Sequence, residues 1–332
     1  MPPSVSRPAI RRLAVAAGGL LVAAAGSAAF AQMSAMPADL AAAIQAGGRK
    51  VDIAAGAALY APLQDKEPYG EVKVVRDLAY GPDPLNRADV FLPQTPRTAQ
   101  SPILLFVHGG GFNTGGKRLG PASPFYDNLG VWAARHHMIG VTIDYRLAPQ
   151  SPWPAGPQDV AKAVAWAKRS AAQWGGDPDA IFLVGHSAGS AHIAAYLTHA
   201  EFQPGGHSGV RGAVLVSGAY TVNPVEGGPP DEASFAARDK VYYGTDPSRY
   251  AEESSFAGLV KSATPLLFVN AELDPLLFRR EADRLQAALQ QAGRPGRFLV
   301  LKGHNHISQV LGVNTADHEL SDAIDQFIRD HR

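Results

Sequence analysis

The chain contains no cysteine among its 332 residues. This absence excludes thiol nucleophiles, disulfide bridges, and zinc or iron–sulfur centres held by cysteine. Charge of one sign is not in excess either, because 30 basic residues balance 30 acidic residues and the formal net charge is zero. A neutral balance offers no broad basic surface to nucleic acid or to an anionic membrane. We therefore expect neither as a partner.

Several recognisable signatures are also missing. The sequence has no H-E-x-x-H zinc motif and no internal repeat, and beyond residue 31 it has no run long and apolar enough to span a bilayer. We expect no metal and no cofactor. Hydrophobic residues make up 46% of the chain, which is ample for the core of one large domain.

The first 31 residues resemble a secretory signal. Three arginines precede an apolar, small-residue run at residues 13–25, and an Ala-x-Ala triplet ends at Ala31. The alternative is a membrane anchor, but the run is short for a hydrocarbon layer of about 30 Å. We expect cleavage after Ala31, a mature chain that starts near Gln32 with no stable membrane anchor, and a periplasmic or secreted location. The Arg11–Arg12 pair is a weak indication of twin-arginine export.

The remaining sequence divides into a lead-in at residues 32–70 and a catalytic domain at residues 71–332. Alternating apolar residues predict a strand at 71–80, which pairs with a second strand at 88–92 across a Gly-Pro-Asp-Pro turn. From residue 100 onward, buried strands alternate with helices, which implies a mostly parallel sheet with helices on both faces. The expected strands are 103–107, 138–143, 181–184, 210–216, 265–269 and 298–301, and the expected helices are 125–137, 158–174, 187–200, 282–292 and 317–329.

Residues 220–264 interrupt this alternation. The segment is rich in glycine and proline and has no clean period, and it is too long for a bare connection. We expect it to be an inserted lid or pocket wall.

The sharpest motif is Gly185-His186-Ser187-Ala188-Gly189. It follows a predicted strand and begins a predicted helix, which is the setting of a nucleophile elbow. The helix directs its N-terminal end at the reaction centre and favours negative charge that develops there. An ordinary serine in a glycine-rich turn is the alternative, but the flanking strand and helix make it the weaker one.

The second motif, His108-Gly109-Gly110-Gly111-Phe112, follows the strand at 103–107. Three glycines let the backbone approach a substrate closely, and free N–H groups there can hold an oxyanion. A flexible loop or a phosphate cradle is the alternative, although no Walker-type Lys-Ser or Lys-Thr follows. We interpret His108 as a structural residue.

Together with Asp144-Tyr145-Arg146-Leu147-Ala148-Pro149, these motifs resemble the hormone-sensitive-lipase-like esterases from about residue 80 to the end. That family usually has aspartate before the nucleophile, where this chain has His186. This difference, with Tyr242-Tyr243-Gly244 and Gly303-His304-Asn305-His306, looks closer to the feruloyl-esterase-like and kynurenine-formamidase-like branch. The resemblance implies an α/β-hydrolase fold.

The resemblance also assigns roles to residues. It implies an oxyanion hole formed by the backbone N–H groups of Gly110, Gly111 and Ala188. It further implies that the Asp144-Tyr145-Arg146 stretch is structural and braces the glycine loop. Charged pairs at strand ends are more often braces than catalysts, so the residues alone favour the same interpretation.

Two partners of Ser187 follow it in the chain, in the order acid and then histidine. Asp274 follows the strand at 265–269 and matches the family position of the acid, with Glu272 as the competitor. Asp274 can also act as a helix N-cap before a proline. His306 follows the last strand and precedes an apolar residue, and His304 is its competitor.

These residues predict a serine hydrolase that cleaves short-chain or aryl carboxylic esters through an acyl-enzyme on Ser187. Its pocket is expected to include Phe112, His186, Tyr220 and Tyr242, with Trp153 and Tyr243 as further aromatic candidates. One alternative keeps the triad and makes the scissile bond an amide, as in an arylformamidase. A second is a non-catalytic exported binding protein on a hydrolase scaffold.

Overall fold

The computed structural model describes residue 1 and residues 36–95, 100–203, 205–222 and 230–332. The predicted signal at residues 1–31 lies outside the described residues apart from Met1. The described part of the lead-in belongs to the same compact unit as the predicted catalytic domain, a unit that spans Ser34–Arg332.

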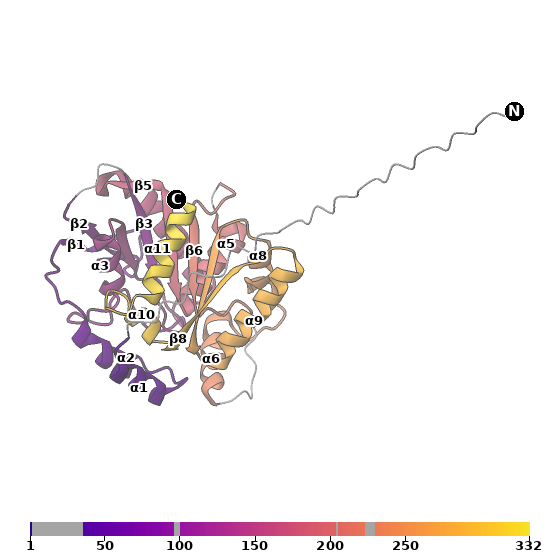
Figure 1. Cartoon of the computed structure of the whole chain (residues 1–332). Helices are drawn as coiled ribbons and strands as arrows, with labels where there is room; N and C mark the ends of the chain where they lie inside the picture. Colours follow the sequence, from indigo (N-terminus) through magenta and orange to yellow (C-terminus); the bar gives the residue numbers. More distant parts are fainter. Residues whose placement is uncertain (2–35, 96–99, 204, 223–229) are drawn as a thin grey trace. The chain divides into compact units, whose positions relative to one another are not determined.

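A single eight-stranded sheet runs through this unit (Figure 1). Its strand order is β1-β2-β4-β3-β5-β6-β7-β8. Strand β2 is antiparallel to both neighbours, and every later pair is parallel. The predicted mostly parallel sheet is therefore confirmed. The strands are β1 (Val72–Ala79), β2 (Arg87–Pro93), β3 (Ser101–Val107), β4 (Ile139–Ile143), β5 (Gly176–His186), β6 (Gly212–Val216), β7 (Leu266–Leu273) and β8 (Arg297–Asn305).

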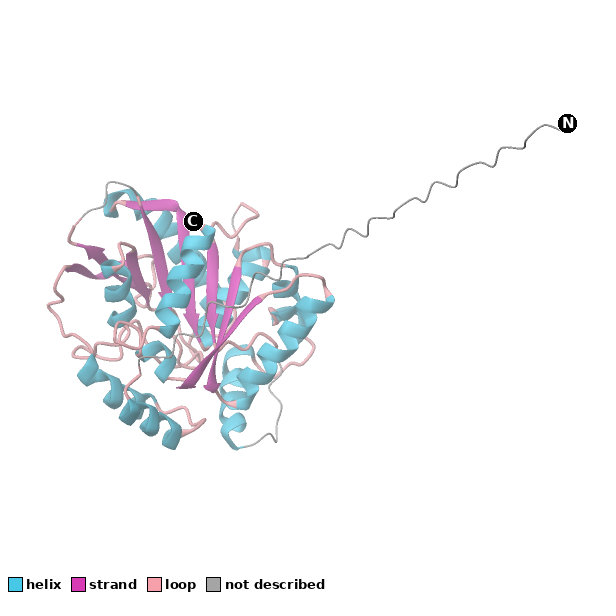
Figure 2. Cartoon of the chain, in the orientation of Figure 1, coloured by secondary structure: helices cyan, strands magenta, loops and turns pink. Residues whose placement is uncertain are grey.

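Helices cover both faces of the sheet, as the sequence predicts (Figure 2). The α-helices are α1 (Ala38–Gly47), α2 (Ile53–Tyr60), α3 (Asp127–Arg135), α4 (Ala155–Ser170), α5 (Ala188–Thr198), α6 (Pro230–Tyr243), α7 (Tyr250–Glu253), α8 (Phe256–Lys261), α9 (Leu276–Gln291), α10 (Ser308–Leu311) and α11 (Glu319–His331). Three short 3₁₀ turns are η1 (Ala61–Leu63), η2 (Ala171–Trp174) and η3 (Ala200–Phe202).

Strand β3 shows why its sequence is apolar at every position. Successive side chains of a strand point to opposite faces. Ile103 and Leu105 belong to the core that contains residues of α4, α5 and α9, whereas Leu104 and Phe106 belong to the core that contains residues of α3 and α11. All seven residues of β3 are buried. Burial on both faces removes the alternation that marks a half-exposed strand such as β1.

Several predicted boundaries differ from the structure, and helix α9 and the segment 220–264 are the clearest cases. Helix α9 begins at Leu276, directly after Pro275, rather than at residue 282. The segment 220–264, which has no clean period in the sequence, contains the three helices α6, α7 and α8. Within the described ranges, no helix has both the length and the apolar character needed to cross a membrane.

The topology brings the candidate residues to one edge of the sheet. Strands β3, β5, β6, β7 and β8 are parallel, so their carboxyl ends meet there. The glycine motif follows β3, Ser187 follows β5, Asp274 follows β7 and His306 follows β8. Sites in open α/β sheets form at this edge.

Candidate active site

Ser187 sits at a tight strand-to-helix turn. Its backbone has φ 54° and ψ −118°, a conformation that non-glycine residues rarely adopt and that costs about 1–3 kcal/mol. Flanking glycines make the turn possible. A Cβ on Gly189 would lie 2.0 Å from the carbonyl oxygen of Val107, and one on Gly185 would lie 2.7 Å from the amide nitrogen of Ser190. The turn holds Ser187 at the edge of a cavity, at the start of α5.

The glycine motif lies directly beside this serine. Gly110 and Gly111 have φ 128° and 59°, and a Cβ on Gly109 would lie 3.1 Å from Cβ of Ser187. Among the described residues, no carbonyl or side chain accepts a hydrogen bond from the amide N–H of Gly110, Gly111 or Ala188. Three unpaired N–H donors beside a nucleophile can stabilise an oxyanion.

The three residues of the Asp144-Tyr145-Arg146 stretch have different partners. The Tyr145 hydroxyl donates to the carbonyl of His108 at 2.9 Å, and the two rings stack with centroids 4.2 Å apart. Asp144 accepts from the amide N–H of Lys117 at 2.6 Å, later in the same loop. Arg146 instead pairs with Asp159 of α4 at 2.9 Å. The expected brace of the glycine loop therefore comes from Tyr145 and Asp144, whereas Arg146 anchors α4.

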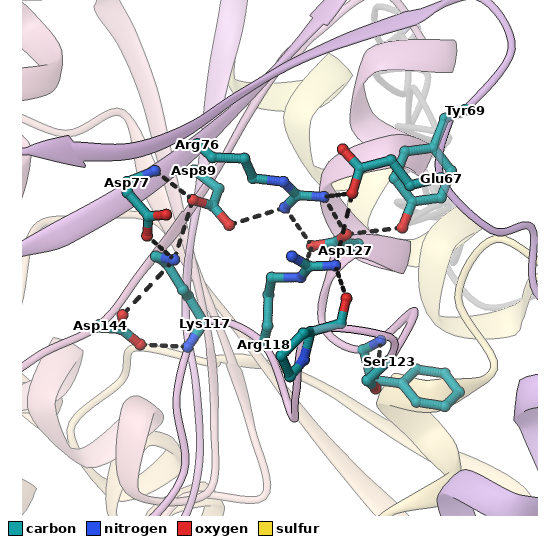
Figure 3. A network of polar contacts seen from close by, with 12 residues as sticks. Glu67, Tyr69, Arg76, Asp77, Asp89, Lys117, Arg118, Ser123, Asp127 and Asp144 are labelled. Atoms are coloured by element: carbon teal, nitrogen blue, oxygen red, sulfur yellow. Dashed lines mark hydrogen bonds and ion pairs between the residues drawn. The ribbon is translucent and has the colours of Figure 1, made fainter.

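Behind the loop lies a buried network of charges that alternate in sign (Figure 3). Lys117 contacts Asp89 of β2 at 3.1 Å, Asp89 contacts Arg76 of β1 at 2.8 Å, and Arg76 contacts Asp127 of α3 at 2.6 Å. The Asp89 and Asp127 side chains are fully buried. The network therefore ties the loop that carries the glycine motif to β1, β2 and α3.

We expect Asp127→Ala to lower the free energy of unfolding by about 3–5 kcal/mol, because it leaves the partly buried Arg76 without its main partner. Asp325→Ala is the matched control, since Asp325 forms a surface pair with Arg329 one turn along α11 and such pairs contribute about 0.5 kcal/mol. Urea titration of both variants measures the difference. Equal losses would show that the network does not stabilise the fold.

Asp274 and His306 form a buried pair. Nδ1 of His306 donates to Oδ1 of Asp274 at 2.8 Å. The other carboxylate oxygen, Oδ2, accepts from the Ser217 hydroxyl at 2.6 Å, the amide N–H of Ala271 at 2.8 Å and the Asn270 side chain at 3.2 Å. Burial by itself raises the pKa of Asp274, but these hydrogen bonds, with that from His306 the strongest, bring it below its usual range. Asp274 is therefore ionised and holds His306 with Nε2 facing away from it.

The structure separates the competing residues. Glu272 accepts from the amide N–H of Gly303 at 2.9 Å and lies near Lys302, on the far side of the turn. Nε2 of His304 lies 3.2 Å from Asp317, and its Nδ1 contacts the Ser308 hydroxyl. Asp274 does not cap α9 with its side chain, because Pro275 is the N-cap residue and no side chain caps this helix.

Sequence reasoning missed the residues that support this pair. Gln309 donates to the hydroxyl of Ser217 at 2.7 Å and to the carbonyl of His306 at 3.0 Å. Arg49 of the lead-in donates to the carbonyl oxygens of Asp274 and Glu272. Position directly after β6 was the one available signal for Ser217. The chain gives no comparable signal for Gln309 or Arg49.

Two cavities meet at Ser187. The narrow cavity has a volume of about 40 Å³ and is mostly apolar, with walls that include Phe112, Ala188, Ala191, Val222, Phe235, Leu277 and Phe278. The wide cavity has a volume of about 350 Å³ and is lined by residues that include Val51, Gly109, Gly110, Gly111, His186, Phe235, His306 and Ile307. Ser187, Gly111, Phe235 and Arg238 line both. Helix α6 and the lead-in thus supply walls of the site.

Only some of the expected pocket residues line the two cavities. Phe112 lines the narrow cavity, and His186 lines the wide one. Tyr220 and Tyr242 line neither, which corrects the prediction. Tyr242 stacks behind Phe112 with centroids 4.5 Å apart, and Tyr220 is buried against Phe268. Tyr243 lines the narrow cavity, whereas Trp153 packs behind it.

Three histidines are buried around the site. His186 donates from Nε2 to the carbonyl of His306 at 2.8 Å, and His108 donates from Nδ1 to the carbonyl of Gly109 at 2.6 Å. Burial lowers the pKa of His108 to about 4, and the pKa values of His186 and His192 to about 3. All three imidazoles are neutral at pH 7 and serve as structural groups.

These histidines predict acid sensitivity. Unfolding returns each pKa to about 6.5, so below that pH the unfolded chain binds protons that the folded chain does not. Stability therefore falls as the pH falls, by up to about 1.4 kcal/mol per pH unit for each histidine and about 4 kcal/mol for the three. Urea titrations at pH 7, 6 and 5 measure the slope. His192→Phe should reduce it by about a third, whereas replacing the exposed His207 with glutamine should not; a flat profile would contradict the prediction.

No group of three or more histidine, aspartate and glutamate side chains arranged to hold a metal ion occurs in the described part of the chain. The arrangement itself offers a hydroxyl, an imidazole held by a carboxylate, and unpaired amide donors.

Comparisons with known proteins identify the family of this chain. The chain is 30% identical over 230 residues to Esterase LipQ of Mycobacterium tuberculosis, an alignment that covers 65% of this chain and 53% of that protein. It is 39% identical over 123 residues to a probable isoprenylcysteine alpha-carbonyl methylesterase of Oryza sativa, covering 37% of this chain and 27% of that protein. The chain thus spans about half the length of the first of these relatives and about a quarter of the second.

Solved structures share the fold. A hormone-sensitive lipase from a metagenome library superposes with a TM-score of 0.66 at 18% identity, covering 90% of this chain and all of that one. An esterase from the archaeon Pyrobaculum calidifontis gives a TM-score of 0.61 at 24% identity, with 80% and 86% coverage. The model of a family described as the alpha/beta hydrolase fold matches residues 104–309, from β3 to the loop and helix after His306. The predicted family is confirmed, and the chain belongs to the α/β-hydrolase fold family.

Proposed function

We propose that this protein is a serine hydrolase that cleaves carboxylic esters through an acyl-enzyme on Ser187. One observation carries the proposal: His306, held by Asp274 at 2.8 Å, lines the same cavity as Ser187 and the glycine motif. Several relatives are esterases by name, Esterase LipQ and Carboxylesterase NlhH among them, and this supports ester hydrolysis.

The mechanism that we propose gives each of these groups a role. Nε2 of His306 takes the hydroxyl proton as Oγ of Ser187 attacks the ester carbonyl. The resulting oxyanion accepts hydrogen bonds from the N–H groups of Gly110, Gly111 and Ala188. His306 then gives the proton to the departing alkoxide, and the alcohol leaves. His306 next takes a proton from a water molecule as its oxygen attacks the acyl-enzyme. The bond between the acyl carbon and Oγ of Ser187 then breaks, His306 gives the proton to Oγ, and the carboxylic acid is released.

We assign the two limbs of the ester to the two cavities. The leaving oxygen receives its proton from His306, so the alcohol limb extends into the wide cavity that His306 lines. The acyl limb then enters the narrow cavity, which His306 does not line. A volume of about 40 Å³ is the space of about three water molecules. The acyl group is therefore small, and the alcohol is larger.

This assignment predicts a steep dependence on acyl length. We expect kcat/KM for p-nitrophenyl acetate to exceed that for the octanoate by at least about 100-fold, because a long chain does not fit the narrow cavity. Val222→Ala removes two methyl groups from its wall and should reduce this difference. The panel is measured with the purified chain. A preference for the octanoate would show that the limbs are assigned the wrong way round.

A formyl amide is the second candidate substrate, because the narrow cavity also suits the smallest acyl group. The same triad can cleave such an amide. Comparing a formanilide with the phenyl acetate of the same ring separates the two reactions. A large preference for the ester would remove the amide from consideration.

A further inference from the structure

Arg238 of α6 reaches into the site at the point where the two cavities meet. It lines the narrow cavity, the wide cavity and a third hollow of about 300 Å³ further out, which we call the outer hollow. A Cβ on Gly111 would lie 2.5 Å from Cδ of Arg238, so the side chain lies against the oxyanion glycines. Its guanidinium is 5.5 Å from the ring centroid of Phe235, which lines the same three cavities.

Arg238 differs from three other partly buried arginines, those of the charge networks around the site. Arg76, Arg118 and Arg146 each have 21% of the side chain exposed, and each pairs with at least one aspartate. Among the side chains that the structure describes, which exclude residues 223–233, no carboxylate forms an ion pair with the Arg238 guanidinium. A partly buried cation without a carboxylate partner is costly for the fold alone, and it is typical of a group that binds an anion.

The charges around Arg238 favour an anion on the side of the wide cavity. Arg49 and Lys50 line the outer hollow with Arg238, and none of the described residues that line it is acidic. Asp52 lines the wide cavity, but it is paired with Lys50 at 2.9 Å and caps α2. Asp239 lines only the narrow cavity, and burial raises its pKa to about 7 although the charge of Arg238 opposes this rise. The described residues that line the wide cavity and the outer hollow therefore carry a net positive charge.

We propose that Arg238 binds a carboxylate carried by the alcohol limb of the substrate. This inference rests on the proposed function and specifies its substrate class as esters of small acids with a hydroxy acid or carboxylated phenol. The wide cavity and the outer hollow share Val51, Phe235 and Arg238, so an alcohol limb that starts at Ser187 and His306 meets the guanidinium on its way out. The planar fork of an arginine matches a carboxylate in a bidentate contact.

A matched substrate pair tests the proposal. 4-Acetoxybenzoate and 4-acetoxybenzamide share the acetyl group, the ring and an electron-withdrawing substituent, and they differ in charge. We expect wild type to favour the anionic ester at least about tenfold in kcat/KM. Arg238→Gln should reduce the anionic-to-neutral ratio at least about tenfold, and Arg238→Lys should fall between the two. Arg297→Gln, at the start of β8 and paired with Asp330, is the control and should keep the wild-type ratio.

The result distinguishes this inference from the proposed function. If wild type hydrolyses the neutral ester through Ser187 and shows no anionic preference, the carboxylate site is wrong and the esterase stands. Binding of 4-hydroxybenzoate to Ser187→Ala, measured by calorimetry, tests the site without turnover. Binding that weakens at least about tenfold with Arg238→Gln in the same background supports the inference. Binding that Arg238→Gln does not change overturns it.

Discussion

Replacing Ser187 with alanine is expected to lower kcat for p-nitrophenyl acetate at least about 10⁴-fold, because the variant lacks the hydroxyl that forms the acyl-enzyme. The fold should survive, since the variant removes one oxygen atom and keeps the backbone of the turn. Circular dichroism and a urea titration check that it does. The residual rate then reports what the amide donors and the cavities contribute without a nucleophile.

Ser190 provides the matched control for this substitution. It lies one turn further along α5, and its hydroxyl donates to the carbonyl oxygens of Gly185 at 2.7 Å and Val216 at 2.9 Å. A hydroxyl engaged in this way is not free to attack a substrate. Ser190→Ala should therefore keep most of the activity. A Ser187→Ala protein that still turns over the ester at a tenth of the wild-type rate would place the nucleophile elsewhere.

The second large effect is expected from Asp274→Asn. The amide keeps the size of the side chain but removes the negative charge and presents a donor where His306 needs an acceptor. The imidazole is then held in the wrong tautomer, and its cationic form loses its stabilising partner. We expect kcat to fall by about 10³- to 10⁴-fold, with a smaller change in KM because Asp274 is fully buried and lines neither cavity.

Glu272→Gln is the control on the same loop. Glu272 accepts from the amide of Gly303 and does not contact His306, so its loss should change kcat less than about tenfold. Steady-state kinetics on the two variants compares the carboxylates directly. If kcat fell further in Glu272→Gln than in Asp274→Asn, Asp274 would not be the catalytic acid. The role proposed for Asp274 in orienting His306 would then also be wrong.

Much of the fold follows from local sequence because its strands are buried on both faces. Runs such as residues 103–107 and 181–184 are apolar throughout and are separated by amphipathic helices, and this alternation dictates a parallel sheet. The edge at which catalytic residues gather then follows from topology. The placement of Ser187, Asp274 and His306 at this edge was therefore predictable, although their catalytic roles stay a prediction.

The walls of the site were less predictable, because helix α6 has no clear apolar period. Without a helical phase, Tyr242 and Tyr243 are equivalent as pocket candidates. The two are successive residues of the helix and therefore lie on different sides of it. Tyr243 lines the narrow cavity, whereas Tyr242 stacks behind Phe112. Arg238 lies on the same helix, and the sequence does not predict its place in the site for the same reason.

Contacts between residues far apart in the sequence could not be predicted either. Arg49 reaches the carbonyl of Asp274, which lies 225 positions further along the chain, and Gln309 reaches Ser217 across 92 positions. Such contacts depend on how the lead-in and α10 pack against the sheet edge. No pattern in the sequence near Arg49 or Gln309 reports that packing.

The most direct test of the central claim is the covalent reaction of the protein with a fluorophosphonate. The phosphorus takes the place of the ester carbonyl carbon, and fluoride is the leaving group. We expect one adduct per chain, located by mass spectrometry on the peptide that contains Ser187, and no adduct in Ser187→Ala. An unmodified protein, or an adduct on another residue, would contradict the assignment of Ser187 as an activated nucleophile.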